Sequence, residues 1–360
     1  MPRRKEIYKL CQKYDVLIIE DEPYWYLQYP SGTAINIANG KQKTAATTFN
    51  TQTDQKSSGF DFLDSLVPSY LSIDVDGRVI RLDTFSKTIA PGCRLGWVCC
   101  AHSCFFQTVI LTIVSQVTAQ PAIIERMLRI TETSTQQPSG FVQSMVIELL
   151  RGPLGASDPG CGGRSDGSGW EVAGWVRWLE GLRGNYERRM NAMCHILHAG
   201  RHLVKAGRRR SLDLDVNDDE DEWAVVETTR MYDFVWPVGG MFVWVEVDYN
   251  SHPLFGHFGG PKLSQALWLF WTTKPYLVLA TPGSIFAPTD EIRAESAWKF
   301  FRLCFAAIDE SALEPVSRRF VEGFHAFWKI KNPKTVQGLL DSIEGPSTEQ
   351  QSVISMMGYC

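Results

Sequence analysis

The sequence predicts an α/β protein with two domains, and three observations support this. At 360 residues, with 44% hydrophobic and 12% aromatic content, the chain has enough apolar material for two cores. Short apolar runs alternate with longer helix-like segments, as in proteins whose strands alternate with helices. A long helix-like segment could connect two domains, and the tract after it, at about residues 206–224, changes from basic to acidic, which predicts a loop. We therefore expect a large domain over residues 1–195, a smaller α+β domain over residues 196–335 and a C-terminal tail over residues 336–360.

The first elements are a helix and a buried strand. Residues 3–14 place Ile7, Leu10 and Cys11 on one helical face. Residues 16–19 follow at once and form an apolar run of strand length. The pattern predicts that this strand is buried.

The middle of the large domain contains an insertion, two strands and helices. The insertion covers about residues 31–75, and its first part is rich in Thr, Gln, Asn, Lys and Ser without any period. Residues 79–82 and 95–100 predict two short strands on either side of a loop that contains Lys87. Residues 105–150 have a mostly helical pattern.

The rest of the chain predicts one long helix and the elements of the smaller domain. Residues 152–169 are glycine-rich and aperiodic, which predicts a second insertion. Residues 175–205 have the length and charge mixture of a helix that connects two domains. Residues 242–247 alternate like a strand, residues 261–272 predict a helix, and residues 300–305 predict another strand.

Composition argues against several classes of function. The formal charge of −4 and the pI near 6.0 give no basis for binding nucleic acid. The nine cysteines lack the paired spacing of a zinc site or a disulfide framework, and a reducing compartment fits them best. No apolar run approaches the length of a membrane span, so we expect a cytoplasmic protein without a membrane partner.

We expect no metal site either. His195, His198 and His202 share one helical face, which is more simply the polar face of a long helix. The segment that begins at Asp213 starts like a calcium-binding loop, but it has Asp218 where that loop needs glycine.

Lys87 is the first candidate for chemistry. Small and hydroxyl residues surround it, and the predicted loop lies between two strands. A lysine amine whose pKa is lowered by a nearby cation can condense with an aldehyde and later move a proton. The alternative is an ordinary solvated lysine in a loop.

Arg94 lies seven positions after Lys87, a spacing that lets both side chains converge on one anion. A guanidinium group binds phosphate oxygens in a bidentate manner, and the hydroxyls of Thr84 and Ser86 can donate to the same group. These residues are therefore candidates for holding a phosphate. Alternatively, Arg94 is a structural arginine at a helix end.

Three further side chains complete the candidate set. Asp21 and Tyr24 lie at the end of the first strand, where α/β sheets place their ligands, although a helix cap and a packed ring are alternatives. Under the functional interpretation, the carboxylate keeps a pyridine nitrogen protonated and the phenol bonds the 3-oxygen of the same ring. Arg302 lies in an apolar strand, and a buried arginine must be paired or bind an anion. A substrate carboxylate and an internal salt bridge both remain open for it.

These motifs resemble the fold-type I pyridoxal phosphate enzymes, and among them the class I/II aminotransferases. The resemblance is strongest to the fungal aromatic amino acid and kynurenine/2-aminoadipate aminotransferases. It is carried by ordered motifs at residues 20–24, 84–87, 91–97, 237–244, 282–286 and 302–305.

The resemblance implies the aspartate aminotransferase-like fold, with a mixed sheet in the large domain, and a homodimer with active sites near the subunit interface. It implies pyridoxal 5′-phosphate as cofactor and the transfer of an amino group from an aromatic or related large amino acid to a 2-oxo acid such as 2-oxoglutarate. The implied roles of the residues are as follows: Lys87 binds the cofactor covalently, Asp21 pairs with its ring nitrogen, Tyr24 contacts its 3-oxygen, Thr84, Ser86 and Arg94 hold its phosphate, and Arg302 binds the substrate carboxylate.

The chain departs from this family at its beginning. Family members carry an N-terminal portion with a glycine-rich phosphate loop, an aromatic residue that stacks on the cofactor and an asparagine that contacts the 3-oxygen. This sequence begins after that portion, so we expect an incomplete large domain in an N-terminally truncated chain. The alternatives are a catalytically impaired or noncatalytic protein on the same fold, including a fragment or an incomplete gene model, and a lyase or regulator that uses the same cofactor.

Overall fold

The computed structural model describes residues 1–41, 57–93, 95, 116–118, 121–134, 139–151, 169–206 and 226–344. The chain divides into two compact units. The first unit comprises Met1–Pro30 and Lys43–Asn185, and the second comprises Ser31–Gln42 and Tyr186–Cys360. The division falls inside helix α6 (Glu171–Ala199), and the boundary expected near residue 195 lies in the same helix.

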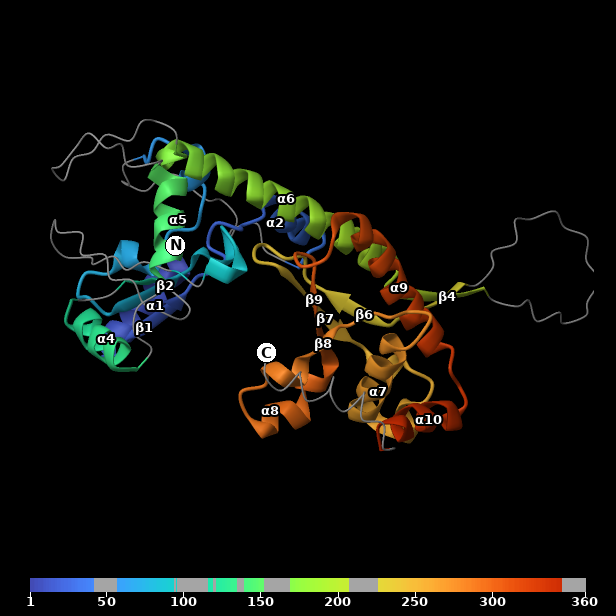
Figure 1. The fold of residues 1–360 in the computed structure, drawn as a ribbon. Helices are drawn as coiled ribbons and strands as arrows, with labels where there is room; N and C mark the ends of the chain where they lie inside the picture. Colours follow the sequence, from blue (N-terminus) through green and yellow to red (C-terminus); the bar gives the residue numbers. More distant parts are fainter. Residues whose placement is uncertain are drawn as a thin grey trace, which may run out of the picture. The chain divides into compact units, whose positions relative to one another are not determined.

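The first unit contains a mixed sheet with helices (Figure 1). Among the described residues the strand order is β1-β2-β3, with β1 parallel to β2 and β3 antiparallel to β2. The strands are β1 (Ile18–Asp21), β2 (Val79–Asp83) and β3 (Gln116–Thr118). The helices are α1 (Pro2–Lys13), α3 (Asp61–Asp64), α4 (Pro121–Ser134), α5 (Gly140–Arg151) and the first half of α6.

The second unit contains two antiparallel sheets. One is the pair β4 (His202–Ala206) and β5 (Val226–Arg230). The other has the order β6-β7-β9-β8, with β6 (Tyr232–Phe234), β7 (Phe242–Val247), β8 (Thr281–Pro282) and β9 (Phe300–Cys304). The helices are α2 (Pro30–Ala38), α7 (Phe255–Thr272), α8 (Asp290–Glu295), α9 (Glu310–Trp328) and α10 (Pro333–Glu344).

The predicted strands at residues 79–82, 242–247 and 300–305 are confirmed as β2, β7 and β9. The helix predicted at residues 261–272 is α7, which begins earlier, at Phe255. A kink joins its two parts at Gly259, whose φ of +70° is accessible to glycine at little cost.

The first helix and strand exist, but the strand lies at Ile18–Asp21 instead of residues 16–19, and the prediction that it is buried was wrong. In α1, Ile7 and Leu10 are exposed, and Tyr8 is the buried residue. In β1, Ile19 is 67% exposed and Glu20 is buried instead. The physical reason is that Glu20 has charged partners on the inner side of the strand, described below.

The expected insertion at residues 31–75 was also wrong in its first part. Helix α2 occupies residues 30–38, and the side chain of Asn36 is buried in the second unit. Its amide nitrogen donates to the carbonyl of Trp236 at 2.9 Å, and its amide oxygen accepts from the Trp236 N–H at 3.0 Å. Gly32 lies so close that a Cβ atom there would be 2.1 Å from the carbonyl oxygen of Pro237. These distant partners stabilise a helix that its own sequence does not predict.

Two helical predictions were too long. Residues 116–118 fall within the expected helical region, but they form β3 because β2 provides an antiparallel partner. The long helix predicted over 175–205 ends at Ala199, and residues 202–206 form β4, which pairs with β5.

Three expected features fall partly or mainly on residues outside the described ranges. They are the strand at 95–100, the insertion at 152–169 and the loop at 206–224. The expected C-terminal tail begins inside α10, where Val336 is fully buried.

An aromatic core fixes α7 and α9 against one face of the second unit's larger sheet. Trp271 of α7 stacks on Phe320 of α9 at 4.6 Å between ring centroids. The same indole meets Phe301 of β9 edge-to-face at 5.1 Å and Phe324 at 4.8 Å. The opposite face of the sheet carries the side chains of Trp244 and Arg302, which are opposite each other on β7 and β9.

His252 is a buried titratable group in this unit. Its Nε2–H donates to the carbonyl of Phe327 at 3.1 Å, and its Nδ1 accepts from the Leu254 N–H at 3.1 Å. These bonds fix the neutral imidazole, because protonation at Nδ1 would remove the acceptor. Burial lowers the pKa of His252 below its ordinary value of 6.5.

We expect the protein to lose stability as the pH falls below about 6.5 because of His252. Below that pH the unfolded state binds a proton that the folded state does not, so the free energy of unfolding declines by up to about 1.4 kcal/mol per pH unit. Urea unfolding of the wild type and of His252→Gln between pH 7 and pH 5 measures this. The variant should show a shallower decline, and equal slopes would contradict the assignment.

Candidate functional site

The parallel pairing of β1 and β2 places the ends of both strands at one edge of the sheet. Asp21, the last residue of β1, is aligned with Leu82 of β2. The pairing continues one residue further, since the Glu22 N–H donates to the Leu82 carbonyl at 3.1 Å. The loops that follow the two strands therefore begin side by side, where α/β proteins commonly bind ligands.

The loop after β2 carries three of the expected residues. Thr84 caps the short 3₁₀ helix η3 (Phe85–Lys87), and its Oγ1 accepts from the Ser86 N–H at 3.1 Å. The hydroxyl of Thr84 also donates to the Ser86 hydroxyl oxygen at 3.0 Å. The loop thus holds two hydroxyl groups together, and Lys87 directly follows Ser86 in the sequence.

The loop after β1 places Tyr24 beside Lys87. The Lys87 Nζ lies 5.7 Å from the centroid of the Tyr24 ring, within the range of a cation–π contact. Lys87 is half-buried, whereas Asp21 is exposed. The structure therefore brings Tyr24, Thr84, Ser86 and Lys87 together, with Asp21 at the adjoining strand end. Arg94 lies outside the described residues.

Apolar contacts and one indole hydrogen bond hold the Lys87 loop against α5 and α6. The ring of Phe85 is buried in a cluster with Leu95 and Val146, and it meets Trp175 of α6 edge-to-face at 5.9 Å. The Trp178 indole N–H donates to the Thr88 carbonyl at 2.6 Å. Side chains of α5 and α6 therefore fix both sides of the lysine.

A charged network that the sequence reasoning missed lies beneath the strand ends. Arg81 is only 6% exposed, and its guanidinium donates to the two carboxylate oxygens of Asp83 at 2.7 and 3.0 Å. It also lies 3.7 Å from Glu20, which is paired with Arg4 at 2.9 Å. The signal available in the sequence was an arginine and two acids inside apolar strands, since buried charges require partners.

This network and the burial around it shift neighbouring titrations. Burial and the charge of Glu20 raise the pKa of Glu22 above its ordinary value. Burial and the nearby Asp83 carboxylate raise the pKa of Tyr26 to about 12. Tyr26 therefore remains a neutral phenol at physiological pH.

The side chains at this edge suit pyridoxal phosphate by their chemistry. An amine for the aldehyde, a phenol for the ring oxygen, a carboxylate for the ring nitrogen and two neighbouring hydroxyls for phosphate oxygens are the groups that such a cofactor requires. Within the described ranges, by contrast, no group of three or more His, Cys, Asp or Glu side chains is placed to hold a metal ion. No helix in those ranges is long and apolar enough to cross a membrane.

Arg302 belongs to the second unit and has an aromatic environment. Its guanidinium carbon lies 4.2 Å from the ring centroid of Phe242 and 4.4 Å from that of Phe286. Among the described residues it forms no ion pair, so the internal salt bridge left open above is not formed there. Two rings that hold the planar group leave its N–H edge suited to a carboxylate. The sequence did not predict this arrangement, because the two rings come from separate segments.

Comparison with known proteins relates the chain to aminotransferases. It is 32% identical over 250 residues to an aromatic amino acid aminotransferase from Schizosaccharomyces pombe, a match that covers 69% of this chain and 37% of that protein. It is 31% identical over 256 residues to the L-tyrosine:2-oxoglutarate aminotransferase AtrD from Tapinella panuoides, covering 71% of this chain and 34% of that protein. No protein-family model matches the chain.

Solved structures give the same relation. The fold matches the crystal structure of the aminotransferase Aro8 from Candida albicans with a TM-score of 0.58 and 27% sequence identity, over 91% of this chain and 54% of that one. The chain thus spans about half the length of this solved relative and about a third of the curated ones. The predicted aspartate aminotransferase-like fold is confirmed.

We expect Arg81→Leu to reduce the stability of the first unit by about 3 kcal/mol, because it leaves the half-buried Asp83 without its cation and the buried Glu20 with Arg4 alone. Urea unfolding followed by tryptophan fluorescence measures the loss. Arg129→Leu is the matched control, since it removes an exposed pair with Glu125 and should cost less than about 1 kcal/mol. Equal effects of both substitutions would show that the buried network does not stabilise the strand ends.

Proposed function

We propose that this chain, a homologue of the fungal aromatic amino acid aminotransferases with their fold, contributes a cofactor-binding lysine and a substrate-binding arginine to a pyridoxal phosphate-dependent aminotransferase. The observation that carries this proposal is the Lys87 amine beside the Tyr24 ring at the joined ends of β1 and β2. The aminotransferases that share this fold depend on pyridoxal phosphate. We assign the same cofactor to this chain.

Different residues of the first unit bind different parts of the cofactor. Lys87 binds its aldehyde, Tyr24 donates to its 3-oxygen, and Asp21 accepts from its protonated ring nitrogen. Its phosphate is held by a further set, namely Thr84, Ser86 and Arg94. When bound, pyridoxal phosphate supplies an electron-withdrawing ring that stabilises negative charge at the substrate Cα.

Lys87 would have a second task as a proton carrier. With cofactor and substrate bound, its amine would take a proton from the substrate Cα and return it on the opposite half of the reaction. The contact with Tyr24 and the loop fixed by Phe85 and Trp178 support this role, because they hold the amine in one position.

The proposed amino donor is an aromatic or related large amino acid, and the proposed acceptor is a 2-oxo acid such as 2-oxoglutarate. This follows the activities named for the relatives from Schizosaccharomyces pombe and Tapinella panuoides. Arg302 binds the carboxylate that donor and acceptor share, and Phe242 and Phe286 keep its planar guanidinium oriented. We also propose that the active form is a homodimer, as the family resemblance implies.

We expect Lys87→Ala to abolish covalent attachment of the cofactor. The test is incubation with pyridoxal phosphate, reduction with borohydride and peptide mass mapping, which locates any added mass on a single lysine without requiring activity. The wild type should carry the mass on Lys87, and Lys13→Ala, which removes an exposed lysine of α1, should behave like the wild type. Equal labelling of Lys87→Ala and the wild type would refute the assignment. A folded wild type without label would favour a noncatalytic protein.

For a wild-type chain that is active, we expect Arg302→Gln to lower kcat/KM for L-phenylalanine by about tenfold to a hundredfold, mainly through a higher KM, because a charge-assisted bond to the carboxylate is lost. Arg302→Lys should recover part of the loss, since it restores the charge without the planar group. The control is Arg318→Gln, which removes an exposed arginine paired with Glu314 on α9. An unchanged KM in Arg302→Gln would exclude the proposed role.

A further inference from the structure

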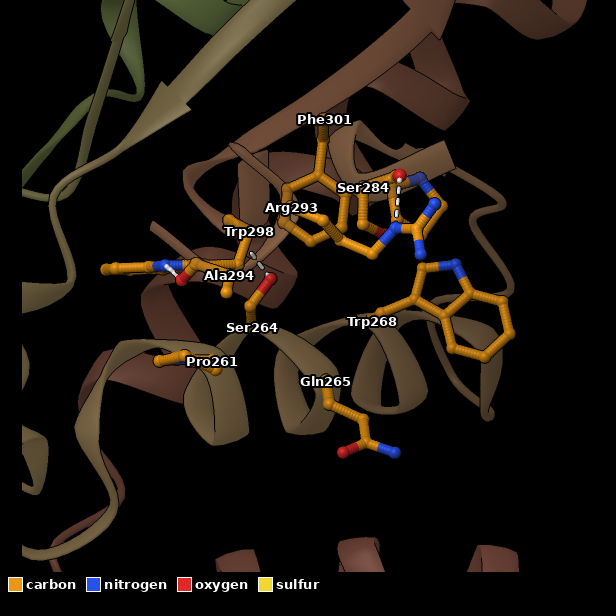
Figure 2. A pocket seen from close by; sticks show the side chains of 10 residues that line it. Pro261, Ser264, Gln265, Trp268, Ser284, Arg293, Ala294, Trp298 and Phe301 are labelled. Carbon is orange, nitrogen blue, oxygen red and sulfur yellow. Dashed lines mark hydrogen bonds between the residues drawn. The ribbon is translucent and has the colours of Figure 1, made fainter. Parts of the chain in front are cut away.

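A cavity of about 330 Å³ lies inside the second unit, between α7, α8 and the strand β9 (Figure 2). Two short 3₁₀ helices, η6 (Gly283–Phe286) and η7 (Ala297–Lys299), close its sides. Its volume is at the lower end of the range for small-molecule sites, which suits a ligand of one or two rings. None of the cofactor or substrate residues assigned above lines it.

Aromatic and proline residues form the apolar part of the cavity lining, namely Trp268, Trp298, Phe301, Pro261 and Pro282. Phe301 is fully buried, so its ring closes the inner end of the cavity. The two indole N–H groups already have partners, because Trp268 donates to the Ala280 carbonyl and Trp298 to the Ala294 carbonyl, each at 3.0 Å. The Trp268 ring therefore offers apolar surface to a ligand, and a planar aromatic body can stack on it.

One cation lies at the edge of this apolar space. Figure 2 shows the Arg293 guanidinium next to the indole of Trp268. Its Nε donates to the Ser284 carbonyl at 3.4 Å, and its Nη1 pairs with Asp290 at 2.6 Å. That ion pair is exposed and weak, and within the described residues Nη2 has no hydrogen-bond partner. An incoming carboxylate can therefore bind at Nη2.

From this combination we propose that the cavity is a second binding site, separate from that of Arg302, for a small planar aromatic carboxylate. The aromatic body lies against the Trp268 indole, and the carboxylate pairs with the neighbouring Arg293. The alternation of β9 separates the two sites, since Phe301 points into the cavity while Arg302 points to the opposite face of the sheet. They are nevertheless neighbours, because η6 supplies Ser284 to the cavity and Phe286 to the Arg302 guanidinium.

The test is binding of 3-indolepropionate to the purified full chain, measured by isothermal titration calorimetry. This probe has no amino group, so binding is measured without turnover. Arg293→Gln should weaken binding about tenfold or more, because it removes the charge-assisted bond. Ala294→Phe should abolish binding by filling the cavity from the exposed helix α8. Arg318→Gln, the matched surface variant, should bind like the wild type.

A further variant and a further ligand separate this site from that of Arg302. Arg302→Gln should keep its affinity for 3-indolepropionate within about twofold, and the neutral 3-indolepropionamide should bind the wild type about tenfold more weakly. Three results would overturn the proposal: no binding to the folded wild type, unchanged affinity in both Arg293→Gln and Ala294→Phe, or loss of binding in Arg302→Gln. Circular dichroism of each variant confirms that it is folded.

Discussion

The parallel pairing of β1 with β2 is the constraint on which the candidate site depends. A parallel pair cannot be closed by a tight turn, so the chain must return to the start of the sheet before β2 begins. In return, both strands end at the same edge, and Asp21 and Leu82 are aligned there. The carboxylate at the end of β1 and the loop that follows β2 thus reach one place, although more than sixty residues separate Asp21 from Lys87. A hairpin would have placed them at opposite ends of the sheet.

Both ion pairs and apolar contacts hold the ends of β1 and β2 in position. Arg81 joins acids from both strands, which resists separation of β1 from β2, because a separated strand would leave a charge buried without its partner. Phe85 and Trp178 act on the loop itself through ring packing and an indole hydrogen bond. The loop that carries the reactive side chains is therefore fixed by these contacts. Lys87 itself is half-buried and accessible to a ligand. A rigid base with an accessible amine is the arrangement that covalent cofactor chemistry requires.

Sequence reasoning succeeded where local pattern and chemistry coincide. The strand at 79–82 is apolar and short, the loop after it is rich in hydroxyls, and both properties are visible without a fold. It failed where the deciding partner is distant. Helix α2 depends on the hydrogen bonds between Asn36 and Trp236, and the burial of Glu20 depends on Arg4 and Arg81. These partners lie far away in the sequence, so the local pattern around α2 or Glu20 could not predict either feature. Arg302 was recognised as a cation within an apolar strand, but its two aromatic neighbours belong to other segments, and only the fold brings them together.

The pair formed by Asn36 and Trp236 has a consequence for how the protein is made. Residues 31–42 belong to the second unit, so the chain enters that unit early, returns to the first and enters the second again at Tyr186. On the ribosome, α2 emerges almost two hundred residues before its partner, and its amide must stay hydrated until Trp236 has been synthesised. Closing so long a loop costs chain entropy and favours slow folding. The second unit is therefore not an independent C-terminal module, and a recombinant segment starting at Tyr186 would lack the helix that satisfies the Trp236 backbone.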